Sequence, residues 1–208
     1  MVEAPNVRHG RTLYRENDLG VFKVFALRGK ILSGNPEAEV VVHPRNVNDF
    51  SDRELIRLAE RVDAAVMAID DGPALIRLNR HFYPRAVTYY PAGHHPARTG
   101  QIIITRPGSP CFACCMGARS GTEIETLHGE PSLGIHFAAI SQLCAQLVVQ
   151  ELASRWGSPL GPPLRPEVSL IAISNMAGEL SPYGPGTRFF RASRDPDCPV
   201  CGQHAERR

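Results

Sequence analysis

The chain has 208 residues, of which 43% are hydrophobic and 21% are charged. This length fits one compact domain, and the composition is that of a folded protein and not of a disordered one. A formal net charge of +2 is too small for the basic field of a non-specific nucleic-acid binder, so no nucleic-acid partner is expected. The sequence has no apolar run of about 18 residues and no signal-peptide pattern, so we expect a cytoplasmic protein without a membrane span.

Hydrophobic periodicity and β-branched runs predict a chain of alternating helices and strands. In chain order they predict a helix over 21–32, a strand over 39–43, a helix over 52–61, a strand over 64–69, a helix over 74–82, strands over 86–90 and 101–105, a helix over 134–155, and strands over 168–174 and 188–191. Either Ser51 or Asp52 is the N-cap of the second helix. The run 64–69 is apolar without alternation, which is typical of a strand buried on both faces of a largely parallel sheet. The segment 91–100 is expected to be a loop.

Two carboxylates, Asp70 and Asp71, directly follow the apolar run 64–69. Ligands of open α/β sheets bind at the carboxyl ends of the strands, and Mg²⁺ prefers one or two carboxylates together with phosphate oxygens. The alternative is a purely structural turn that caps the next helix. Lys23 likewise admits two interpretations: a phosphate contact near a helix start, or a solvated surface lysine.

Two Cys-x-x-Cys pairs are the strongest signal in the chain. Cys111 and Cys114 form one pair and Cys198 and Cys201 form the other, with 83 residues between them. Four thiolates complete a tetrahedral zinc site of the structural type, which would tie the late part of the chain to its middle. Cys115 is an alternative ligand to Cys114, or a reactive thiol beside the metal.

In order along the chain, these segments resemble the ThiF/MoeB/HesA family, bacterial relatives of ubiquitin-activating enzymes. The similar motifs are the stretch from Val2 to His9, Asp18-Leu19-Gly20-Val21-Phe22-Lys23, Asn35-Pro36, Asp70 nine residues before Asn79, the segment from Gly100 to Cys114, the helix over 134–152, and the closing segment from Arg194 to Gly202.

The resemblance implies adenylation, with Mg-ATP, of the C-terminal carboxylate of a ubiquitin-like or sulfur-carrier protein. It assigns Asn6, Arg8 and Lys23 to the phosphates and ribose of ATP, and Asp70 to Mg²⁺ and ATP. It assigns the four paired cysteines to zinc. Lys23, Asp70 and Arg8 are then the candidate catalytic residues, because displacement at the α-phosphate needs charge neutralisation and alignment.

The chain departs from the family pattern at its start. The family begins with a strand and a Gly-x-Gly-x-x-Gly loop, and neither precedes Val2 here. We therefore expect a truncated member, a chain completed by another subunit, or a relative that no longer binds ATP.

Together these observations predict an α/β fold: a partial Rossmann-like, ThiF-type adenylation domain with a mixed sheet. A single domain over 1–208 is expected, with residues 1–106 the remainder of the nucleotide-binding part and residues 107–208 a zinc-stapled part. The expected activity is carrier-protein adenylation by a homo- or hetero-oligomer. The rivals are a non-catalytic interaction or dimerisation module and a zinc-dependent redox or binding protein that uses Cys115.

Overall fold

The computed structural model of the chain describes residues 1–7, 13–94, 99–117, 134–158, 164–174 and 184–202. Its elements, in chain order, are α1 (Ala4–Val7), η2 (Glu16–Asp18), α2 (Lys23–Gly34), η3 (Val47–Asp49), α3 (Asp52–Ala59), β1 (Ala64–Val66), α4 (Gly72–Phe82), β2 (Val87–His94), β3 (Thr99–Thr105), α5 (Phe112–Met116), α6 (Gly134–Arg155), β4 (Leu170–Ser174) and β5 (Gly186–Phe190). No helix within the described ranges is long and apolar enough to cross a membrane.

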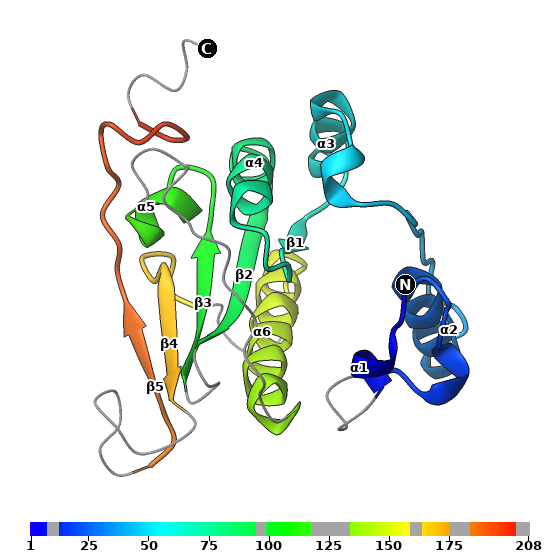
Figure 1. Cartoon of the computed structure of the whole chain (residues 1–208). Coiled ribbons are helices and arrows are strands. Elements are labelled where there is room, and N and C mark those ends of the chain that lie inside the picture. Colours follow the sequence, from blue (N-terminus) through cyan, green and yellow to red (C-terminus); the bar gives the residue numbers. More distant parts are fainter. Residues whose placement is uncertain (8–12, 95–98, 118–133, 159–163, 175–183, 203–208) are drawn as a thin grey trace.

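The five strands form one mixed sheet in the order β1-β2-β3-β4-β5 (Figure 1). Only β1 and β2 are parallel, with Ala65 opposite Thr88, and the other three pairs are antiparallel. The prediction of a mixed sheet is confirmed, while that of a largely parallel one is wrong. The predicted loop over 91–100 is also largely wrong, because β2 and β3 extend into it as a hairpin.

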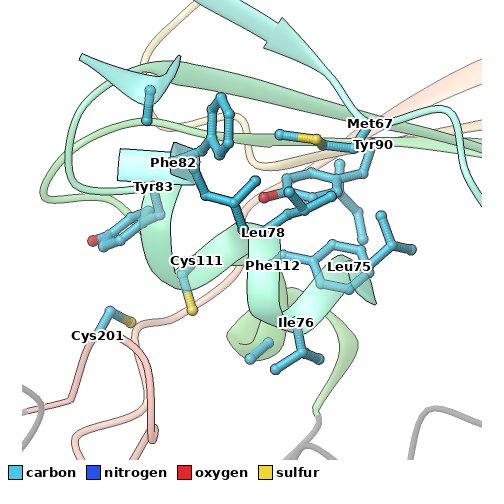
Figure 2. Packing of buried hydrophobic residues seen from close by; sticks show 14 of the residues in the cluster. Met67, Leu75, Ile76, Leu78, Phe82, Tyr83, Tyr90, Cys111, Phe112 and Cys201 are labelled. Atoms are coloured by element: carbon cyan, nitrogen blue, oxygen red, sulfur yellow. The ribbon is translucent and has the colours of Figure 1, made fainter. Parts of the chain in front are cut away.

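Each face of the sheet has its own core, because strand side chains alternate between faces. On one face, Tyr89, Ile102 and Ile104 pack against Ile140 and Leu147 of α6. On the other face, the residues that pack together are Tyr90 and Ile103 of the sheet, Leu75, Leu78 and Phe82 of α4, and Phe112 of α5 (Figure 2). The second core is continuous with three of the paired cysteines, so the predicted metal site adjoins the sheet through α4 and α5.

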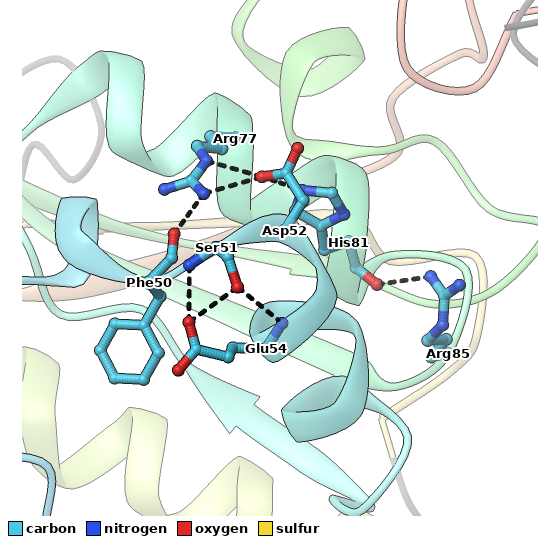
Figure 3. A network of polar contacts seen from close by, with 7 residues as sticks. All are labelled: Phe50, Ser51, Asp52, Glu54, Arg77, His81 and Arg85. Atoms are coloured by element: carbon cyan, nitrogen blue, oxygen red, sulfur yellow. Dashed lines mark hydrogen bonds and ion pairs between the residues drawn. The ribbon is translucent and has the colours of Figure 1, made fainter.

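Helix α3 begins where local side-chain bonds dictate. Ser51 is its N-cap: the Ser51 hydroxyl accepts from the backbone N–H of Glu54, and the Glu54 carboxylate accepts from the backbone N–H of Ser51. Asp52 in the first turn accepts from Arg77 of α4 at 2.7 Å and lies 3.1 Å from Nε2 of His81 (Figure 3). These contacts fasten α3 to α4.

Strand β1 is shorter and more exposed than its sequence predicts. It ends at Val66, whose exposed fraction is 49%, and it forms an edge of the described sheet. The prediction of a central strand buried on both faces is therefore wrong for the described residues. A continuous apolar run shows that both faces of a strand are suited to burial. Burial also requires neighbouring elements that cover both faces.

The N-terminal part lies apart from the sheet and is joined to α3 by an extended segment (Figure 1). Helix α2 confirms the helix predicted over 21–32, yet several of its apolar side chains are exposed, including Phe25 and Ile31. The strand predicted over 39–43 is wrong: these residues join no sheet, and Val41 is 72% exposed. A β-branched run forms a strand only where a partner strand meets its backbone groups.

Gly100 of β3 lets α6 approach the sheet closely. A Cβ there would overlap Cδ1 of Ile140 and lie 2.7 Å from its Cγ1 and 3.1 Å from the carbonyl oxygen of Ala92. We expect Gly100→Ala to lower the free energy of unfolding by roughly 1–3 kcal/mol, because the added methyl overpacks this contact. Urea unfolding followed by circular dichroism measures the change.

Two further variants test whether the contact between Gly100 and Ile140 causes this loss of stability. In a Gly100→Ala/Ile140→Val double variant, the lost Cδ1 makes room for the new methyl, so the combined cost should be less than the sum of the single costs. Gly29→Ala in α2, where a Cβ would meet nothing within 4 Å, should not destabilise the chain. Additive costs for the Gly100 and Ile140 changes would contradict the explanation.

Candidate metal centre and nucleotide site

The four paired cysteines meet at one point in the fold. Their Sγ atoms all lie within 4.8 Å of one another: Cys111 is 3.5 Å from Cys198 and 3.9 Å from Cys114, and Cys114 is 3.4 Å from Cys201. Sulfurs bound to one tetrahedral zinc at about 2.3 Å would be about 3.8 Å apart. The cluster therefore has the size and the soft donor set of a structural zinc site. It confirms that the pairs converge and places Cys114, not Cys115, in the group.

Local backbone geometry aims the sulfurs inward. Cys111 is the N-cap of α5, and Cys114 stands one turn later on the same helix. In the second pair, the backbone N–H of Val200 points at Sγ of Cys198 at 3.5 Å. The backbone N–H of Asp195 approaches Sγ of Cys114 at 3.4 Å and links the two halves. Such N–H groups stabilise negative charge on sulfur.

Gly202 and Arg194 complete the turn of the second pair. A Cβ at Gly202 would lie 2.5 Å from the carbonyl oxygens of both Pro196 and Cys198, so only glycine fits there. Arg194 donates from Nε to the carbonyl oxygen of Cys201 at 2.6 Å. A glycine directly after a Cys-x-x-Cys pair is a sequence signal for such a turn, whereas nothing near Arg194 in the sequence indicates its contact.

The electrostatics of the cluster favour a bound cation. Cys111, Cys198 and Cys201 are almost inaccessible to solvent (Figure 2 shows Cys111 and Cys201 approaching each other). Hydrogen bonds from the Cys111 and Cys114 thiols lower the pKa of Cys201, while the corresponding bonds to Cys114 and Cys201, together with burial, raise that of Cys111. Without a cation, one thiolate suppresses ionisation of its neighbours, and a divalent ion compensates for several thiolates at once.

The two remaining cysteines lie outside the group. Burial, followed by the charges of Cys114 and Cys201, raises the pKa of Cys115 to about 12, which is opposite to what an activated thiol needs. Cys144 is buried on α6 and packs in the other core, and its burial raises its pKa to about 11. The interpretation of Cys115 as a reactive thiol therefore finds no support in its surroundings.

The structure separates the roles of the two carboxylates that follow β1. Asp71 is the N-cap of α4: its Oδ1 accepts from the backbone N–H of Ala74 at 3.0 Å, and its Oδ2 accepts from Nδ2 of Asn48 at 3.0 Å. These two bonds, in that order, lower the pKa of Asp71. Asp70 is exposed, and within the described ranges its carboxylate takes part in no hydrogen bond or ion pair. Asp70 is thus the carboxylate that remains available to a ligand.

The other candidates for ATP binding lie in the N-terminal part. Lys23 is exposed at the first position of α2, and Asn6 lies in α1, where its Oδ1 accepts from the backbone N–H of Glu3 at 3.0 Å. Arg8 lies outside the described residues. The convergence of Asp70, Asn6 and Lys23 on ATP remains a prediction.

Solved structures share this fold. Two complexes of MccB from E. coli, one with MccA-N7isoASN and one with ATP, each superpose with a TM-score of 0.72 at 18% identity. They cover 98% and 97% of this chain and 58% and 56% of their own. A third structure, microcin C7 biosynthetic enzyme MccB with N-formylated MccA, has a TM-score of 0.61 at 15% identity and covers 91% of this chain and 55% of its own.

The chain therefore spans a little over half the length of these structures, and the low identities establish the fold alone. No curated protein matches the chain. A model of the ThiF family matches residues 2–200, almost the whole sequence. The chain belongs to the ThiF family.

Proposed function

We propose that this chain takes part in ATP-dependent adenylation of a C-terminal carboxylate, borne by a peptide or by a ubiquitin-like or sulfur-carrier protein. The observation that carries the proposal is the ThiF family match over residues 2–200. Two printed features of the similar structures support it: one MccB structure holds ATP and others hold MccA. In the reaction, a carboxylate oxygen bonds to the α-phosphorus of ATP as the bond to pyrophosphate breaks, which yields an acyl adenylate.

In this proposal Asp70 holds Mg²⁺ on the nucleotide, and Lys23 and Arg8 neutralise its phosphates, with Asn6 on the nucleotide as well. The exposed Asp70 carboxylate at the carboxyl end of β1 supports its part, because ligands of α/β sheets bind at that edge. Cys111, Cys114, Cys198 and Cys201 would hold zinc, which supplies folding energy and leaves no open position for substrate.

The remaining assignments follow from the same proposal. A thiolate metal site requires reduced cysteines, which supports a place in the cytoplasm. The exposed apolar side chains of α2 and the edge strand β1 support assembly as a homo- or hetero-oligomer. We also propose that residues 1–106 and 107–208 act as the nucleotide-binding and metal-bearing parts of one domain.

One observation favours a second function, that of a non-catalytic interaction module. Helix α2 exposes apolar side chains, with Phe25 44% and Ile31 48% exposed. Such a surface is able to receive a carrier or a partner subunit without any nucleotide.

Calorimetric titration of the metal-loaded chain with Mg-ATP distinguishes the two functions without knowledge of the carrier. Adenylation predicts micromolar binding that is lost when Mg²⁺ is chelated with a chelator too weak to remove zinc from four thiolates. A folded, metal-loaded chain that gives no heat with Mg-ATP would contradict nucleotide binding by this chain and would favour the interaction module.

A further inference from the structure

Asn79 of α4 is a fully buried polar residue beneath the first turn of α5. Its exposed fraction is 0%, and its Oδ1 accepts from the backbone N–H of Phe112 at 3.2 Å and from the Tyr90 hydroxyl at 3.3 Å. The Tyr90 and Phe112 rings stack with centroids 4.4 Å apart. Because the backbone N–H of Phe112 can only donate, an oxygen must face it, and the amide therefore has one favourable orientation.

That orientation leaves the amino group of Asn79 in need of an acceptor. Nδ2 is inaccessible to solvent and has no hydrogen-bond partner within the described part of the chain. A buried donor without an acceptor is rare in folded proteins, and it indicates that the amino group has an acceptor in the functional state of the protein. Among the described residues, Thr105 contributes the other such buried atom, a hydroxyl oxygen in the sheet.

A candidate metal ligand lies beside this amide in the fold. Phe112, whose backbone N–H donates to the Asn79 oxygen, directly follows Cys111, the N-cap of α5. Cys111 is 0% exposed and packs in the same core as Phe112 and as Leu78, the residue before Asn79. The Cys111 sulfur is therefore the acceptor that these buried surroundings offer to the amino group, and an N–H donor favours sulfur in its anionic form, the form that binds a metal.

We propose that Asn79 is a positioning residue of the metal centre, which donates from Nδ2 to the Cys111 thiolate and so completes its own hydrogen bonding when the four cysteines hold a metal. The inference rests on the zinc site proposed above. Through this bond, α4 fixes the direction of the Cys111 sulfur from outside the two Cys-x-x-Cys segments. Outer partners of this kind orient metal ligands and tune their donor strength.

The isosteric change Asn79→Asp tests the donor, because it keeps an oxygen for Phe112 and Tyr90 and replaces the amino group by a second oxygen. In the full chain, competition with a chromophoric chelator should show zinc binding roughly 10- to 100-fold weaker than in the wild type. The sulfur-to-cobalt charge-transfer band of the Co²⁺-loaded variant should move to longer wavelength, because a thiolate without its N–H donor gives up electrons more readily. Leu147→Ala in the α6 core is the control for lost stability alone, and it should change neither readout.

A measurement on the wild-type chain keeps the proposal testable if Asn79→Asp does not fold. With the NMR-active cadmium isotope bound, the side-chain N–H of Asn79 should show scalar coupling to cadmium through the N–H···S bond. Unchanged affinity and an unchanged cobalt band in Asn79→Asp, or the absence of that coupling, would overturn the role of Asn79. A wild-type chain that binds neither zinc nor cobalt would instead overturn the metal site itself, so the two failures are distinguishable.

Discussion

Cys198→Ser is expected to abolish tight metal binding and to lower Tm by roughly 10 °C or more. Cys198 is 4% exposed, and its Sγ lies 3.5 Å from that of Cys111. A serine hydroxyl stays protonated at neutral pH and is a much weaker zinc ligand than a thiolate. The variant therefore loses one of the four ligands, and with it the folding energy that the bound ion supplies. Elemental analysis of protein purified under reducing conditions, together with calorimetric melting, measures both effects.

Cys115→Ser is the matched control for this prediction. Cys115 is adjacent to Cys114 in the chain but lies outside the four-sulfur group, so the control should keep one metal ion per chain. If Cys198→Ser retained the wild-type metal content, or if the wild-type chain contained no metal, the assignment of these cysteines would be wrong.

The second large effect concerns the nucleotide: Asp70→Asn should weaken Mg-ATP binding by roughly 10- to 100-fold, the usual loss for one charge-assisted contact. The change removes the charge and preserves the shape of the side chain. Lys23→Ala should weaken binding similarly, because it removes a positive charge from the phosphates. Calorimetric titration of the metal-loaded chain gives each affinity.

Asp71→Asn is the adjacent, isosteric control. Asparagine is as good an N-cap as aspartate, so the Asp71→Asn variant should keep α4 capped and bind Mg-ATP as the wild type does. Equal losses in the Asp70 and Asp71 variants would refute the division of roles between the two carboxylates.

Elements with strong local signals were predictable from the sequence. Helix α4 follows an Asp-Asp-Gly-Pro turn, and α6 has the bounds that its apolar residues predict. The sequence alone leaves Ser51 and Asp52 as alternative caps of α3, and in the structure the cap is Ser51, because Glu54 stands three residues later and completes the reciprocal bonds.

Strand predictions failed where the outcome depends on a distant partner. Residues 39–43 and 64–69 have the composition of strands, but the first forms none and the second is a strand only over Ala64–Val66. A strand forms only where a second segment pairs with its backbone and covers its side chains. The sequence of the strand itself does not say whether such a segment lies beside it.

The same distinction applies to the site. The four cysteines were identifiable because metal-ligand spacing is a local pattern. The contact of Asn79 with α5 was not, because Asn79 and Phe112 are 33 positions apart and only the packed helices bring them together. The spacing of Asp70 and Asn79 contributes to the family resemblance, but it does not say which atoms the Asn79 amide contacts.

The separation of the two cysteine pairs also sets an order of events during synthesis. Cys111 and Cys198 are 87 residues apart, and α6, β4 and β5 all lie between the pairs. The ribosome must therefore release α6, β4 and the edge strand β5 before all four candidate ligands exist. Until then, Cys111 and Cys114 stand without the second pair, and the proposed ion would complete its ligand set only after β5 has been synthesised.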